Sequence, residues 1–108
     1  MTTFDDREQG FESKFTHDKE LEFRVTARRN KLVGLWAAQL LGIHGNDAET
    51  YAKTVIAADL EKPGDSDVVD KVLADFKAHN VDMSEHRLRK QMEELAQAAR
   101  QQIMTEKS

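Results

Sequence analysis

The chain has 108 residues, of which 39% are hydrophobic and 33% are charged, so it can build one small domain around a single core. Its formal net charge of −4 argues against a general affinity for nucleic acid, and the absence of cysteine excludes disulfides and thiolate metal sites. Because strand-favouring residues never alternate over a useful length, we expect an all-α fold, namely a small four-helix bundle with a long first helix and a flexible N-terminal arm.

The predicted arm, residues 1–17, is dense in charge yet carries three phenylalanines. Phe4, Phe11 and Phe15 are seven and then four residues apart, which would place them along one side of a helix. Such a segment buries too little apolar surface to become ordered alone, whereas it can become helical against a partner. The pattern is typical of a peptide that binds in a groove of another protein. The alternative, that the arm packs back onto the bundle, stays open.

The bundle domain, residues 18–108, is expected to begin with a helix from about Asp18 to about Leu41. This helix carries an apolar stripe at helical spacing, formed by Leu21, Val25, Leu32, Leu35, Trp36 and Leu40. Phe23 points away from the stripe, so it is either an exposed contact residue or part of a second packing face. Gly42 suits the left-handed position that follows a helix C-terminus.

The second helix is expected from about Asp47 to Glu61. Asn46 and Glu49 have the spacing of a capping box, in which each side chain binds a backbone N–H of the first turn. The segment Pro63-Gly64-Asp65 then breaks the chain, because proline cannot continue a helix and glycine permits the turn.

Two further helices complete the predicted bundle. Asp65 or Ser66 caps the third, which runs to about His79 and is terminated by Asn80. Ser84 caps the fourth, and its end is expected to fray from about Thr105. The apolar positions of both helices recur at three- and four-residue spacing: Val68, Val69, Val72, Leu73 and Phe76, then Leu88, Met92, Leu95, Ala99 and Ile103.

No constellation of side chains supports catalysis, so we expect a protein that is not an enzyme and holds no metal or cofactor. The histidines are His17, His44, His79 and His86, and no pair has the i, i+4 spacing at which two imidazoles share a metal ion. The paired carboxylates Asp5-Asp6 lie on a segment that offers no rigid, desolvated pocket to separate their pKa values.

A cluster of basic residues in the first helix raises the question of anion binding. Arg24, Arg28 and Arg29 lie within about two helical turns and are candidate contacts for an anion or a nucleotide. A nucleic-acid reader is not expected, because such domains carry a net positive charge. Direct insertion into a membrane is not expected either, because the longest apolar stretch is far too short to cross a bilayer.

The chain resembles a known family in several segments. These are Phe4-Asp5-Asp6-Arg7-Glu8, Lys14-Phe15, His17-Asp18, Ala27-Arg28-Arg29-Asn30, Trp36-Ala37-Ala38, Leu40-Leu41-Gly42 and Pro63-Gly64-Asp65. They are similar to the zeta subunit of alphaproteobacterial F-type ATP synthases. The resemblance covers the whole length but is dense only to about residue 42.

The resemblance implies a four-helix bundle whose N-terminal segment inhibits ATP hydrolysis. The segment would fold into a helix in a catalytic interface between the alpha and beta subunits, reach the gamma subunit and block rotation. The partner-binding residues would be Phe4, Asp5, Asp6, Arg7, Glu8, Glu12, Lys14 and Phe15. Phe11 joins this set as the third aromatic of the arm, although it has no match in the family pattern.

The resemblance also implies where the protein acts. It would be a cytoplasmic protein, monomeric when free, held at the inner face of the plasma membrane through the ATP synthase. The alternative is a helical nucleotide-binding or regulatory module without strong inhibition.

Overall fold

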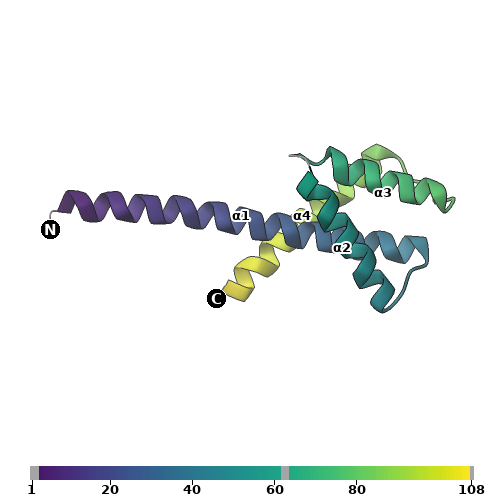
Figure 1. Cartoon of the computed structure of the whole chain (residues 1–108), viewed down its shortest axis with the longest axis horizontal. Coiled ribbons are helices and arrows are strands. Elements are labelled where there is room, and N and C mark those ends of the chain that lie inside the picture. Colours follow the sequence, from purple (N-terminus) through teal and green to yellow (C-terminus); the bar gives the residue numbers. More distant parts are fainter. Residues whose placement is uncertain (1–2, 62–63, 108) are drawn as a thin grey trace.

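The computed structural model describes the backbone of residues 3–61 and 64–107, and the side chains of residues 19–60 and 64–106. The described residues form four helices and no strand: α1 (Thr3–Leu41), α2 (Asn46–Glu61), α3 (Ser66–Ala78) and α4 (Glu85–Lys107). The predicted all-α bundle with a long first helix is confirmed. In Figure 1, α1 reaches well beyond the region where the other helices gather.

The first helix begins earlier than the sequence indicated. It starts at Thr3 rather than near Asp18, and its 39 residues correspond to a length of about 58 Å. Once a helix is nucleated by packing, adding a residue forms a hydrogen bond at little further cost, so the bundle can extend α1 towards the N-terminus. The separate arm of residues 1–17 stays a prediction, because the side chains of this segment lie outside the described residues.

The main core brings together side chains from all four helices. Trp36 and Phe76 meet edge to face, with ring centroids 5.8 Å apart. The buried members of the core are Val33, Ala37, Val55, Val68, Val69, Val72, Phe76, Leu88 and Met92. The predicted apolar positions of α3 and α4 therefore account for most of it.

The predicted stripe on α1 was wrong at one end. Leu40 is 43% exposed, whereas Val33, Ala37 and Ala38 are buried. The reason is that α2 packs very close to α1: a Cβ atom on Gly34 would lie 2.5 Å from the Cα of Ala52. Because α2 covers the face of α1 that carries Gly34, the small residues Ala37 and Ala38 on that face are buried, although the predicted stripe of large side chains does not include them.

Several helix ends follow the predicted turn residues. Gly42 and Asn80 adopt positive φ angles of 78° and 61°, and the backbone N–H of Arg87 donates to Oγ of Ser84 over 3.1 Å. The expected capping box is not formed. Asn46 is already the first residue of α2, and the backbone N–H of Glu49, which the side chain of Asn46 would have bound, donates to the carbonyl of Gly45 over 3.5 Å.

Two other boundaries differ by a few residues. The third helix ends at Ala78, one residue before the predicted end. The fourth continues to Lys107 instead of fraying from Thr105, whose hydroxyl donates to the carbonyl of Gln101 over 2.8 Å. Packing of the last turns of α4 against α1, described below, explains why this end stays helical.

A polar contact ties α2 to α3 at the edge of the core. The hydroxyl of Tyr51 donates to Asp75 over 2.7 Å, and Nζ of Lys71 donates to the same oxygen over 2.9 Å. Burial, and then the adjacent carboxylate, raise the pKa of Tyr51 far above its usual value. The phenol therefore stays protonated and keeps donating over the whole physiological range.

Candidate protein-binding site

The predicted partner-binding residues all belong to the N-terminal part of α1. They are Phe4, Asp5, Asp6, Arg7, Glu8, Phe11, Glu12, Lys14 and Phe15, and their backbone is helical. Their side chains lie outside the described residues, so their contacts are not discussed. In Figure 1 this part of α1 continues straight out of the bundle.

The part of α1 that follows is held by the end of α4. A second apolar cluster places Val25 against Ala99 and Ile103, with Leu21 and Leu32 packed around them. This cluster joins residues that are more than 70 positions apart in the sequence. The turns of α1 around Leu21 and Val25 are thus packed against α4, just after the N-terminal part of α1 ends.

Polar contacts surround this second cluster. Arg28 donates to Gln102 over 2.8 Å and pairs with Glu106, and Arg100 pairs with Glu22 over 2.6 Å. Glu106, Arg100 and Glu22 are exposed and Arg28 is partly exposed, and ion pairs at the surface contribute little to stability. Burial of the apolar cluster, rather than charge, therefore holds α1 against α4.

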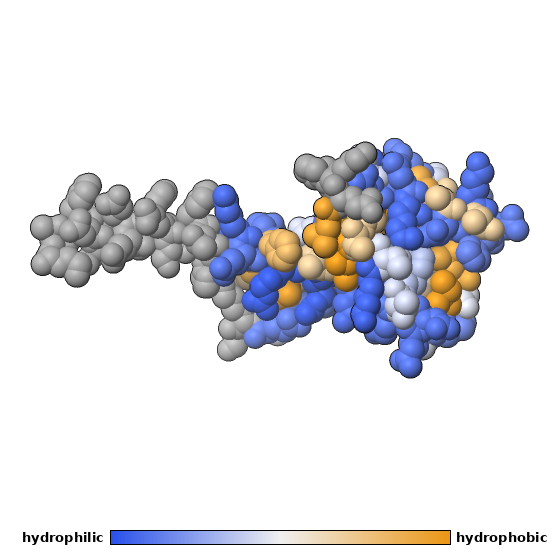
Figure 2. Space-filling model, in the orientation of Figure 1, coloured by the Kyte–Doolittle hydropathy of each residue, from blue (hydrophilic) through white to orange (hydrophobic). Residues whose placement is uncertain are grey.

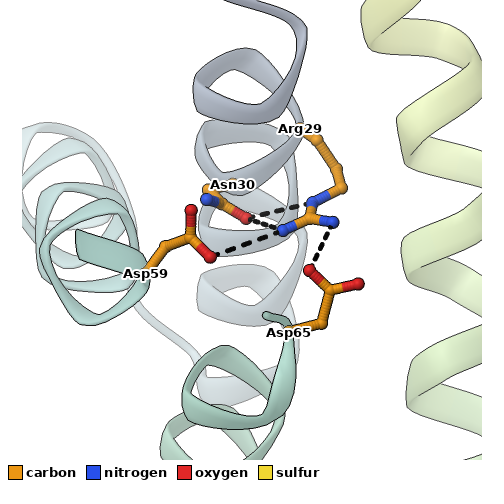
Figure 3. A network of polar contacts seen from close by, with 4 residues as sticks. All are labelled: Arg29, Asn30, Asp59 and Asp65. Carbon is orange, nitrogen blue, oxygen red and sulfur yellow. Dashed lines mark hydrogen bonds and ion pairs between the residues drawn. The ribbon is translucent and has the colours of Figure 1, made fainter. Parts of the chain in front are cut away.

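Arg29 is the centre of the most buried polar contact in the described part of the chain (Figure 3). Its Nε and Nη2 atoms both donate to Oδ1 of Asn30, over 3.1 and 2.7 Å. Its Nη1 atom donates to Asp65 over 2.9 Å, and Asp59 lies 3.9 Å from Nη2. The guanidinium thus joins α1 to the end of α2 and to the residue that precedes α3.

This contact gives a physical reason for two of the segments that carry the family resemblance. Arg29 and Asn30 belong to one of them, and Asp65 belongs to the turn that separates α2 from α3. Asp65 precedes α3 as expected, but its side chain makes no cap hydrogen bond, because it accepts from Arg29 instead. The sequence indicated Arg29 only as a candidate contact for an anion or a nucleotide, and no local pattern predicted that Asn30 is buried beside it.

Replacing Arg29 tests this structural role. We expect Arg29→Met to lower the free energy of unfolding by about 2 kcal/mol, because the side-chain oxygen Oδ1 of Asn30 would be buried without a hydrogen-bond donor. Arg24→Met is the matched control, since Arg24 is exposed on the same helix and should change stability by no more than about 0.5 kcal/mol. Urea unfolding followed by circular dichroism measures both. Equal stability of the two variants would contradict the role assigned to Arg29.

The three candidate anion contacts do not form one site in the structure. Arg24 and Arg28 line the same shallow groove, whereas Arg29 lines a cavity of about 210 Å³ on another face. That cavity is lined by two bases, Arg29 and Arg89, and by two acids, Asp65 and Glu93, so it has no net positive charge. Binding of an anion or nucleotide by Arg24, Arg28 and Arg29 stays a prediction.

Two other kinds of site are absent from the residues that the structure describes. No group of three histidine, cysteine, aspartate or glutamate residues in the described part of the chain could hold a metal ion. No helix in the same residues is long and apolar enough to span a bilayer.

Comparisons with known proteins agree with the fold. The family model for ATPase inhibitor subunit zeta matches residues 1–102. Four chains of solved structures match significantly; one, a solution NMR structure, is 42% identical, with a TM-score of 0.71, and the alignment covers 80% of this chain and 98% of that chain. No curated protein matches significantly. Since the family model covers nearly the whole sequence, the chain belongs to the family of ATPase inhibitor subunit zeta.

Proposed function

We propose that this protein inhibits ATP hydrolysis by an F-type ATP synthase, and that the N-terminal part of α1 is the inhibitory element. The family match carries the proposal that it inhibits. The course of α1 supports the choice of element, because one helix from Thr3 to Leu41 joins the N-terminal residues directly to the bundle.

The proposed mechanism is steric. The N-terminal segment enters a catalytic interface between an alpha and a beta subunit, becomes a stable helix there, reaches the gamma subunit and blocks rotation. Phe4, Phe11 and Phe15 act as anchors, because buried aromatic side chains contribute most of the affinity at such interfaces. The charged side chains Asp5, Asp6, Arg7, Glu8, Glu12 and Lys14 pair with groups along the interface and fix the orientation of the helix.

In this proposal the bundle positions the N-terminal segment. The α4 contacts at Val25 and Arg28 keep the base of the segment fixed, so the segment loses less freedom on binding than an isolated peptide would. The protein itself catalyses nothing in this scheme. It binds from the cytoplasm and stays at the inner face of the plasma membrane only through the ATP synthase.

A hydrolysis assay tests the proposal. The purified chain, added to the purified catalytic sector of the ATP synthase, should reduce ATP hydrolysis until one chain is bound per complex. If hydrolysis is unaffected at saturating concentration while ATP shifts the NMR signals of the bundle, the nucleotide-binding alternative replaces the proposal.

A further inference from the structure

An apolar patch lies on the surface where the end of α2 passes over α1 (Figure 2). Phe23 is 67% exposed and Leu60 is 69% exposed, the two highest values among the large hydrophobic side chains that the structure describes. Large apolar groups on a soluble domain are normal when scattered, but a group of them on one surface marks an interaction site.

Phe23 borders a shallow groove of about 340 Å³. Phe23 and Ala27 line it from α1, Ile56 from α2 and Ile103 from α4. Leu60 follows Ile56 by one helical turn, so it extends the apolar surface along α2. The groove thus has a floor made by three helices and is open to solvent along its length.

The charge around the groove has one sign. Arg24, Arg28 and Lys31 line it together with the apolar residues, and no acidic residue does. Arg28 is paired with Glu106, but among the described residues no ion pair engages Arg24 or Lys31. The groove is therefore locally positive although the chain has a net charge of −4, and such a surface favours an acidic occupant.

The position of the groove relates it to the inhibitory element. Phe23 lies six residues after the predicted arm on the same helix, which corresponds to about 9 Å. A partner protein that binds the N-terminal segment would therefore also be close to the groove. The segment itself cannot occupy the groove while α1 is continuous, because both belong to one straight helix.

We propose that this groove binds an acidic helical segment, with apolar side chains on one face, on the surface of the catalytic sector. This inference rests on the proposed function and adds a second contact that is independent of the N-terminal segment. The span from Arg24 to Lys31 is about 10 Å, which matches two turns of a bound helix. An apolar strip flanked by basic side chains matches the mode in which an amphipathic helix binds in a groove.

Variants of the full-length chain test the groove. Phe23→Ser with Leu60→Ser removes the apolar contacts, and Arg24→Glu with Lys31→Glu reverses the charge. All four residues are exposed, so circular dichroism should show unchanged folding. The matched controls are Leu40→Ser, an exposed leucine at the far end of α1, and Lys77→Glu with Lys90→Glu, two exposed lysines on α3 and α4.

The readout is the dissociation constant for the immobilised catalytic sector at two salt concentrations. Each groove variant should bind about tenfold more weakly than the wild type, and the charge reversal should also weaken the salt dependence. The controls should bind as the wild type does. Groove variants that bind like the wild type, in a series where deleting residues 1–17 abolishes inhibition, would overturn this inference and leave the proposed function intact.

Other occupants give different results. If the wild type binds vesicles containing phosphatidylglycerol and only the groove variants lose this binding, the groove faces a membrane and the inference is wrong. If sedimentation shows a wild-type dimer that the groove variants dissociate, the occupant is a second copy and the inference is also wrong. A wild type that does not bind the catalytic sector at all would overturn the proposed function, and this inference with it.

Discussion

Deleting residues 1–17 should abolish inhibition of ATP hydrolysis and leave the bundle folded. Every described core side chain, from Val25 to Ile103, lies outside the deleted segment, and so does the Arg29 contact. The deletion removes Phe4, Phe11 and Phe15, and the loss of even two aromatic anchors corresponds to a potency at least about a hundredfold lower. Hydrolysis by the purified catalytic sector, titrated with either protein, measures the difference.

A replacement variant is the matched control for this deletion. Substituting residues 1–17 by a glycine-serine linker of equal length keeps the chain length but removes the anchors and charges, so it should not inhibit either. Circular dichroism and urea unfolding verify that both variants keep the bundle. Full inhibition by the shortened chain would show that the bundle, not the N-terminal segment, is the inhibitory element.

Gly34→Leu should lower the free energy of unfolding strongly. Even a Cβ atom at this position would lie 2.5 Å from the Cα of Ala52 and 2.9 Å from its Cβ. The first of these is a backbone atom, so no side-chain rotation relieves the clash and α2 has to move away from α1. Such a separation opens the main core, and we expect a loss of about 4 kcal/mol in the free energy of unfolding.

Two further substitutions serve as comparisons for Gly34→Leu: a smaller side chain at the same position, and a leucine at an exposed position of the same helix. In an exposed helix, replacing glycine by alanine stabilises by about 1 kcal/mol, but Gly34→Ala should destabilise because overpacking costs about 1–3 kcal/mol. Gln39→Leu adds a leucine at an exposed position of the same helix and should leave stability nearly unchanged. Urea unfolding of the three variants gives the comparison. A Gly34→Leu protein as stable as the wild type would contradict the close approach of α1 and α2.

The sequence predicted those parts of the fold that depend on local pattern. The positive φ angles of Gly42 and Asn80 and the cap at Ser84 follow from single residue types, and the buried positions of α3 follow from their spacing. The error at Leu40 arose because a distant segment decides which residues are buried. Leu40 has the spacing of a core residue but is exposed, because the contact between Gly34 and Ala52 determines which face of α1 the second helix covers.

In the candidate site too, local patterns were predictable from the sequence and contacts between distant residues were not. The aromatic spacing and the charge of the N-terminal segment are visible in the sequence, and so is the cluster of basic residues that follows. The partners of those basic residues are not, because Arg28 meets Glu106 and Arg29 meets Asp65 only after the chain has folded. Phe23 was left open between an exposed contact and a second packing face, and the structure places it on the surface.

Photo-cross-linking of the full-length chain to the catalytic sector tests the central claim most directly. A photoreactive phenylalanine analogue at position 4 or 11, illuminated during ATP hydrolysis, should form cross-links to both alpha and beta subunits at a catalytic interface, and the analogue at position 40 should not. Cross-links from positions 4 and 11 that lie only on the outer surface of the complex, or only within the chain itself, would contradict the account.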